Sequence, residues 1–173
     1  MITKLLRDGV CSVAALAMLG MATAAAVERL PPPHDTPILQ ISGDIEVTNA
    51  DGRAEFDLAM LEEIGVSRLQ TSTPWTQGRP VFEGVLLRDL LEEVGANGDT
   101  VVAIALNDYR VEIPMSDLRN YPVLLASRMD GQRLRVRDKG PLWIIYPQDE
   151  YSELRTKQIQ SRWVWQIKEL HIN

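Results

Sequence analysis

The chain has 173 residues, of which 45% are hydrophobic and 24% are charged, and its formal net charge at pH 7 is −6. This length and composition predict one globular domain. Proteins that bind nucleic acid neutralise phosphates with clustered Lys and Arg side chains, so we expect no nucleic-acid partner for an acidic chain without a basic arm.

The first 26 residues have the pattern of a secretory signal peptide. Lys4 and Arg7 give a positive start, residues 10–21 are apolar, and residues 22–26 offer small-x-small cleavage sites. The apolar run is too short for a comfortable membrane span. We therefore expect residues 1–26 to be removed, leaving a periplasmic or secreted protein with no membrane span. The alternative is an uncleaved anchor.

Removal of that segment would also take away Cys11, the only cysteine of the chain. The mature protein would then have no disulfide and no thiolate ligand for a metal. The two histidines, His34 and His171, have no partner at the spacing of metal ligands. We therefore expect no metal site.

Residues 27–37 are rich in proline and predict an extended linker, so the domain itself is expected at residues 38–173. Many short strands and two or three short helices predict an α+β or mainly β fold. Helices are expected at residues 58–64, where Asp57 is a candidate N-cap, and at residues 85–94. Strands are expected at residues 38–42, 53–56, 68–73, 100–106, 109–113, 123–129, 142–146 and 163–172, the last with a register shift. The core is expected to include Leu87, Leu90, Leu91, Ile104, Ile144 and Trp165.

Four cations recur at every second position before a turn at Gly140-Pro141. In an extended chain this spacing places all four on one face. A cationic face that leads by a tight turn into a buried strand can hold an anion. The alternative is a solvated edge strand whose charges resist aggregation. The cations are Arg133, Arg135, Arg137 and Lys139.

Three short segments carry side chains that can line a pocket beside these cations. Residues 71–75 combine hydroxyl groups with a tryptophan, residues 107–109 form a polar turn, and residues 162–165 combine a cation with two tryptophans. Each segment has an alternative interpretation as ordinary turn chemistry or core packing. For Trp165 we favour the core.

Taken in order, several segments resemble the sulfite-oxidase-type molybdopterin-binding domain, and in particular a small secreted bacterial branch of that family. The resemblance covers almost all of the chain after the linker. It implies an α+β fold with a largely β core and a family activity of molybdopterin-dependent oxidoreduction. The matching segments are 82–91, 107–109, 124–131, 139–142 and the pair Arg162-Trp163.

The chain departs from the pattern of that family at three places. The family holds molybdenum through a cysteine after the strand that here ends in the hydroxyl residues Thr71, Ser72 and Thr73. A hydroxyl is a hard, weakly acidic donor and does not replace a thiolate on a soft-ligand metal site. The family's Gly-Pro-Leu-Arg is Gly-Pro-Leu-Trp at residues 140–143, and its Lys-Trp is Arg162-Trp163.

We therefore expect a non-catalytic domain that needs no cofactor and binds a small anionic or heterocyclic ligand, or a periplasmic partner protein of a signalling or redox system. One alternative is a genuine oxidoreductase with atypical metal ligation and molybdopterin as cofactor. A second is a purely structural interaction domain. The pocket would have tryptophan walls and a positive potential. The candidate ligand-binding residues are Thr71, Thr73, Trp75, Asn107, Asp108, Tyr109, Arg137, Lys139, Trp143 and Arg162.

The predicted export can be tested by mass spectrometry of the protein recovered from outside the cytoplasm of its own host. The first residue should lie near Ala25 or Val27, because signal peptidases cut after small residues. A full-length product retained in the membrane would contradict this prediction.

Overall fold

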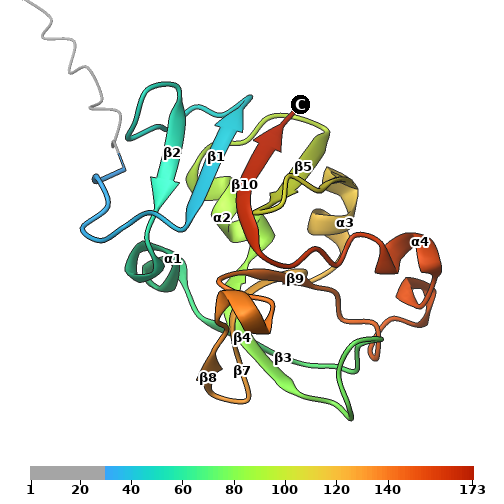
Figure 1. The fold of residues 1–173 in the computed structure, drawn as a ribbon. Helices are drawn as coiled ribbons and strands as arrows, with labels where there is room; N and C mark the ends of the chain where they lie inside the picture. Colours follow the sequence, from blue (N-terminus) through green and yellow to red (C-terminus); the bar gives the residue numbers. More distant parts are fainter. Residues whose placement is uncertain (1–29) are drawn as a thin grey trace, which may run out of the picture.

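Two β-sheets and four α-helices make up residues 30–173, which are the residues that the computed structural model describes (Figure 1). The predicted signal peptide and Cys11 lie outside them. In the first sheet the order is β2-β1-β10-β5-β6, with β1 and β10 parallel and the other neighbours antiparallel. Its strands are β1 (Leu39–Gly43), β2 (Arg53–Phe56), β5 (Thr100–Ala105), β6 (Arg110–Pro114) and β10 (Ile167–Ile172).

The second sheet is antiparallel and has the order β3-β4-β7-β8, with β9 also paired to β7. Its strands are β3 (Ser67–Gln70), β4 (Val81–Leu86), β7 (Leu124–Met129), β8 (Gln132–Arg133) and β9 (Trp143–Ile145). The helices are α1 (Leu58–Ile64), α2 (Leu87–Glu93), α3 (Met115–Asn120) and α4 (Lys157–Gln160), with 3₁₀ turns η1 (Val136–Asp138) and η2 (Ser152–Leu154). No helix in residues 30–173 has the length and apolar character to cross a membrane.

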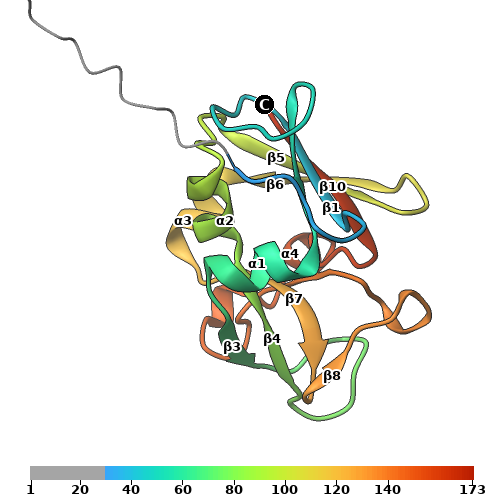
Figure 2. The same cartoon turned by 90° about the vertical axis from the view of Figure 1, so that its left-hand side faces the viewer.

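The core lies between the two sheets and under α1 and α2. Figure 2 shows α1 beside the lower sheet, and α1 contacts both β2 of the first sheet and β4 of the second. The apolar face of α2 is buried, as its helical spacing predicts, and so are the β-strand positions Ile104 and Ile144. Five of the six predicted core residues are thus confirmed. Trp165 is only partly buried and is treated with the site below.

Asp57 fixes the start of α1 and also the segment before β1. One carboxylate oxygen accepts a hydrogen bond from the backbone N–H of Met60 at 2.9 Å, as predicted for an N-cap. The other accepts from the backbone N–H groups of His34 and Asp35 at 2.9 and 3.0 Å. These backbone N–H groups, the one of Asp35 first, hold the pKa of Asp57 below its usual value. The end of the proline-rich segment is therefore attached to the domain.

Several predicted elements differ from the structure: the strands expected at residues 68–73 and 163–172 are the shorter strands β3 and β10. The helix expected at residues 85–94 begins at Leu87, because residues 81–86 form the buried strand β4. A short apolar run fits the pattern of a helix as well as that of a buried strand. The pairing that makes it a strand is with β3 and with β7, which lies far along the sequence. The alternating cations do not share one face, because β8 ends at Arg133 and η1 begins at Val136. The register shift expected in the last strand is confirmed, between Ile167 and Glu169.

The burial of α2 predicts the effect of one truncation. Leu90→Ala should lower the free energy of unfolding by about 2–5 kcal/mol, because it removes a fully buried side chain and leaves a cavity. Urea denaturation measures the change. Val66→Ala is the matched control: Val66 is 57% exposed, and its truncation should cost at most about 0.5 kcal/mol. Similar losses for the two variants would show that the packing of α2 is misassigned.

Candidate functional site

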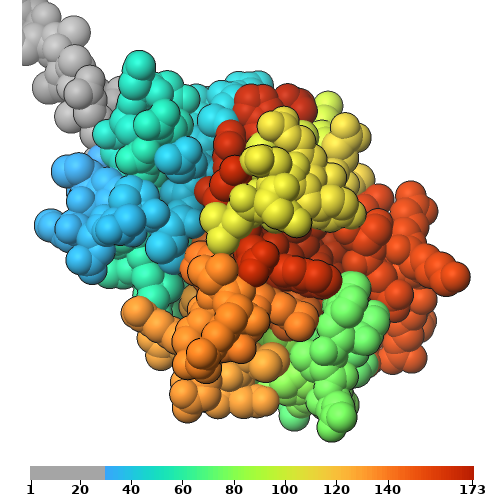
Figure 3. Space-filling model, viewed as in Figure 1, coloured from blue at the N-terminus to red at the C-terminus, as the bar shows by residue number. Residues whose placement is uncertain are grey.

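A cavity of about 300 Å³ opens where the β5–β6 hairpin, the loop after β3 and the segment before β10 meet. Figure 3 shows these three segments, in yellow, green and red, on one face of the molecule. No charged side chain is among the residues that line the cavity. The lining residues are Trp75, Ala105, Asn107, Tyr109, Gln160, Ser161, Trp163, Val164, Trp165 and Gln166.

All four tryptophans of the chain form one cluster, and three of them line this cavity. The ring of Trp75 lies 5.4 Å from that of Trp165, 6.0 Å from that of Trp163 and 6.4 Å from that of Trp143, measured between centroids. Edge-to-face pairs at such distances contribute about 0.5–1.5 kcal/mol each beyond their buried area. Trp75 is 38% exposed and Trp165 is partly buried, whereas Trp143 and Trp163 are buried.

Trp143 is the buried base of this cluster and does not line the cavity. Its side chain is fully buried, with its ring edge-to-face against Phe82 at 5.4 Å. The indole N–H groups of Trp143 and Trp163 are buried and have no hydrogen-bond partner in residues 30–173. A buried donor without a partner costs about 1–3 kcal/mol. Trp163 also lines the cavity, although its N–H group is itself buried.

Lys139 approaches the cluster as a cation. Its ammonium lies 5.5 Å from the ring centroid of Trp143 and 5.6 Å from that of Trp165. Cation–π contacts of this kind contribute about 0.5–2 kcal/mol. The backbone carbonyl of Lys139 accepts from the N–H of Gln166 at 3.2 Å, which ties its loop to the cavity wall. Lys139 does not line the cavity. Its ammonium contacts the ring of Trp165, which does.

Arg162 is directed to a buried ion pair instead of the cavity. Its guanidinium donates to Asp117, and the hydroxyl of Tyr146 donates to the same carboxylate oxygen at 3.0 Å. Burial first, and then the Asp117 carboxylate, raise the pKa of Tyr146, so its hydroxyl stays protonated. Tyr146 stacks on Trp163 with ring centroids 6.2 Å apart. Arg162 thus supports one wall of the cavity from behind.

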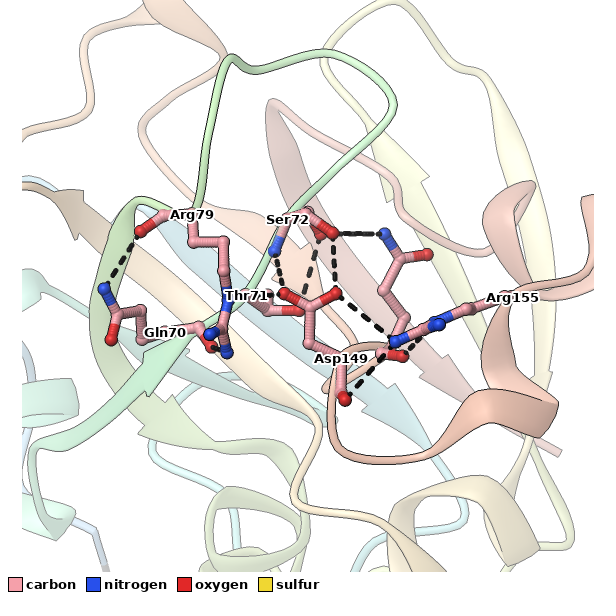
Figure 4. Close-up of polar contacts among 7 residues, drawn as sticks. Gln70, Thr71, Ser72, Arg79, Asp149 and Arg155 are labelled. Atoms are coloured by element: carbon pink, nitrogen blue, oxygen red, sulfur yellow. Dashed lines mark hydrogen bonds and ion pairs between the residues drawn. The ribbon is translucent and has the colours of Figure 1, made fainter.

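The loop that carries Trp75 is held by the carboxylate of Asp149 (Figure 4). The backbone N–H and the hydroxyl of Ser72 donate to it at 2.8 and 2.7 Å, and Arg79 donates at 2.8 Å. Burial alone would raise the pKa of Asp149, but the donors from Ser72 and Arg79 outweigh it and the pKa lies below its usual value. Gln148 donates to the Ser72 carbonyl at 2.8 Å.

The neighbouring threonines also use their hydroxyl groups within the loop. Thr71 is buried, with its hydroxyl 3.4 Å from the Ser72 carbonyl. The hydroxyl of Thr73 accepts from the backbone N–H of Trp75 at 3.0 Å and pairs with the hydroxyl of Thr76 at 2.8 Å. Neither threonine lines the cavity, and Thr73 contacts the backbone of Trp75 directly.

The residues at the end of β3 do not fit a molybdenum ligand. The hydroxyls there are engaged with protein groups, and the single carboxylate nearby is neutralised by arginine. Molybdenum bound through one protein sulfur needs a thiolate, and residues 30–173 contain no cysteine. No three His, Asp or Glu side chains of these residues are grouped to hold a metal ion. His171 instead pairs with the hydroxyl of Ser42 at 2.9 Å.

Of the three candidate residues at the tip of the β5–β6 hairpin, two face the cavity and one does not. Asn107 and Tyr109 line the cavity, and the Asn107 side chain accepts from the backbone N–H of Tyr109 at 3.2 Å. Asp108 has a positive φ of 64° and pairs with Lys168 at 2.6 Å, outside the lining. The hydrogen bond from Lys168, and then its charge, lower the pKa of Asp108. Arg137 is exposed on η1, with its Nε 3.5 Å from Asp138.

The structure therefore brings three of the ten candidate residues into one cavity: Trp75, Asn107 and Tyr109. The other candidates support the walls, pair elsewhere or stay exposed. The predicted positive lining is wrong for this cavity, because no charged residue lines it. The sequence signal at residues 162–165 marked the right segment, although Trp163 and Trp165 rather than Arg162 line the cavity. Gln160, Ser161 and Gln166 carried no recognisable signal. The ligand-binding role of the ten residues remains a prediction.

Comparison with known proteins gives a family and a fold. The sequence model described as the oxidoreductase molybdopterin binding domain matches residues 50–167. The crystal structure of the sulfane dehydrogenase SoxCD from Paracoccus pantotrophus is similar, with a TM-score of 0.57 and 21% sequence identity. The match covers 78% of this chain and 37% of that one, so the chain spans well under half of that protein. No curated protein matches the chain. The predicted α+β, sulfite-oxidase-like fold is confirmed.

The Asp149 network generates a prediction for stability against pH. A carboxyl whose pKa is lowered by folding stabilises the fold above its unfolded value, near pH 4, and this contribution is lost as pH falls through the folded value. Asp149→Asn should therefore lower the free energy of unfolding at pH 7 by about 1–3 kcal/mol. The difference from the original protein should shrink below about pH 4.

Urea denaturation at pH 7 and pH 3 measures this difference. Asp51→Asn is the control, because it removes the same charge from an exposed turn and should change stability little at either pH. An unchanged difference between pH 7 and pH 3 for Asp149→Asn would show that the carboxylate charge does not hold the loop.

Proposed function

This chain belongs to the oxidoreductase molybdopterin-binding domain family, and we propose that it uses the family fold to bind a flat heterocyclic ligand in the tryptophan-lined cavity, without molybdenum redox chemistry. The observation that carries the proposal is that three tryptophans, Trp75, Trp163 and Trp165, line one cavity. Aromatic rings are bound through stacking and edge contacts, and the exposed faces here belong to Trp75 and Tyr109.

The polar groups of the cavity support a ring with hydrogen-bonding edges. The lining offers the amides of Asn107, Gln160 and Gln166, which both donate and accept. A cavity with apolar walls and a few polar groups is the usual form of a small-molecule site. An anionic substituent would gain from Lys139 nearby, while the ring itself needs no charge.

The proposal excludes a molybdenum role because the end of β3 offers no suitable donor. Its hydroxyls hold the Trp75 loop in place through the carboxylate of Asp149 and through Thr76. The second candidate function is a molybdopterin-dependent oxidoreductase with atypical ligation, which family membership favours. We further propose that the domain acts in the periplasm, as the signal-like residues 1–26 predict.

Isothermal titration with adenine, pterin-6-carboxylate and cyclohexanecarboxylate tests the ligand class. The two flat rings should bind and the saturated ring should not, because only a flat ring can stack on the indoles. Tyr109→Ala should weaken binding about tenfold, since it removes an exposed aromatic wall. Leu106→Ala is the matched control on the same hairpin: Leu106 does not line this cavity and its truncation should leave binding unchanged.

Metal analysis of protein purified from its own host separates the two candidate functions. The binding domain should contain no stoichiometric molybdenum. Molybdenum at one equivalent, with oxidoreductase activity, would establish the second function. Failure of every flat ring to bind would overturn the ligand proposal.

A further inference from the structure

Hydrogen bonds inside the protein fix the orientation of two side-chain amides that line the aromatic cavity. The side-chain oxygen of Asn107 accepts from the backbone N–H of Tyr109 at 3.2 Å. The side-chain NH₂ group of Gln166 donates to the backbone carbonyl of Val136 at 2.6 Å. A backbone N–H can only donate and a backbone carbonyl can only accept, so neither amide can turn round without losing its partner.

Each amide therefore keeps one definite group for a ligand. Asn107 keeps its NH₂ group, which is a donor, and Gln166 keeps its side-chain carbonyl, which is an acceptor; neither group forms a hydrogen bond within residues 30–173. The hydroxyl of Ser161, which also lines the cavity, donates to the carbonyl of Gln158 at 2.7 Å and can therefore only accept from a ligand. The lining thus has a fixed donor on the hairpin and fixed acceptors on the segment before β10.

The donor of Asn107 and the acceptor of Gln166 belong to segments that are joined at this point. The backbone N–H of Leu106, the residue before Asn107, donates to the backbone carbonyl of Gln166 at 2.8 Å. A ligand edge that satisfies both amides has to carry an acceptor beside an N–H donor. No charged side chain lines the cavity, so the polar lining selects by this pattern rather than by charge.

We propose that the cavity selects a flat ring with a cyclic-amide edge: a ring carbonyl accepts from the NH₂ group of Asn107, and the adjacent ring N–H donates to the side-chain carbonyl of Gln166. Asn107 then determines specificity, because a ring without these groups still stacks on the indoles but leaves the two amides without partners. This inference rests on the proposed function and names the class of ring that the cavity takes.

Two ligands that differ by one methyl group test the ring N–H. Isocarbostyril, a benzene ring fused to a cyclic amide, has a carbonyl beside an N–H, and N-methylisocarbostyril has the same flat ring without that N–H. Isothermal titration should show about tenfold tighter binding of isocarbostyril, because methylation removes the donor and leaves the Gln166 carbonyl unpaired. Equal affinities of the two compounds would overturn the inference.

Asn107→Asp tests the donor on the hairpin. Aspartate keeps an oxygen for the N–H of Tyr109 and replaces the NH₂ group by a second acceptor. Isocarbostyril binding should weaken about tenfold, with little change in the urea midpoint of unfolding. Asn120→Asp is the matched control: Asn120 is exposed at the end of α3 and does not line the cavity, so its affinity should be unchanged.

Undiminished binding by Asn107→Asp would also overturn the inference. The ligand pair is measured on the original protein, so it decides the question whatever the stability of this variant.

Adenine separates this inference from the proposed function. Failure of both isocarbostyrils to bind a protein that binds adenine would overturn the cyclic-amide edge alone. Failure of adenine, pterin-6-carboxylate and both isocarbostyrils would overturn the proposed function and this inference together. The expected result is binding of adenine and of isocarbostyril, with the N-methyl compound about tenfold weaker than isocarbostyril.

Discussion

The backbone pairing between β9 and the segment before β10 joins the two sheets, and the candidate site depends on it. The N–H of Ile144 donates to the carbonyl of Val164 at 2.9 Å, and the N–H of Ile167 donates to the carbonyl of Leu142 at 3.1 Å. This pairing brings Trp143 of the second sheet beside Trp165, which precedes the first sheet. Since a buried peptide group must find a partner, the path of this segment is closely determined.

The segment that pairs with β9 then changes direction and enters β10 of the first sheet. Gln166 makes that turn with a positive φ, at a cost that neighbouring hydrogen bonds offset. Its carbonyl contacts the β5–β6 hairpin, and its side chain and N–H contact the two ends of the η1 loop, so one residue joins these two loops. The walls of the aromatic cavity are therefore placed by contacts between segments far apart in the sequence, and not by one segment alone.

Local patterns predicted most of the fold, and long-range partners account for what they missed. The N-cap at Asp57, the polar turn at residues 107–109 and the apolar face of α2 depend on nearby residues and were predicted correctly. The alternation of cations is also local, but η1 breaks it, and no local pattern shows that Arg162 meets a carboxylate 45 positions away. Ser72 and Asp149 are 77 positions apart, so the loop they fix was beyond sequence reasoning.

The departures from the family pattern form a consistent chemical set. Ser72 donates through its hydroxyl and its backbone N–H to Asp149, and a thiolate has no proton with which to make the first of these bonds. A carboxylate at that distance would also disfavour a thiolate by repulsion between like charges. At the position where the resemblance implies an arginine, the buried Trp143 packs edge-to-face against Phe82, and a guanidinium buried there would need a counter-ion. The hydroxyl loop and its carboxylate position Trp75, whose ring lies 6.4 Å from that of the buried Trp143, so these two departures from the pattern that the resemblance implies meet in one aromatic cluster.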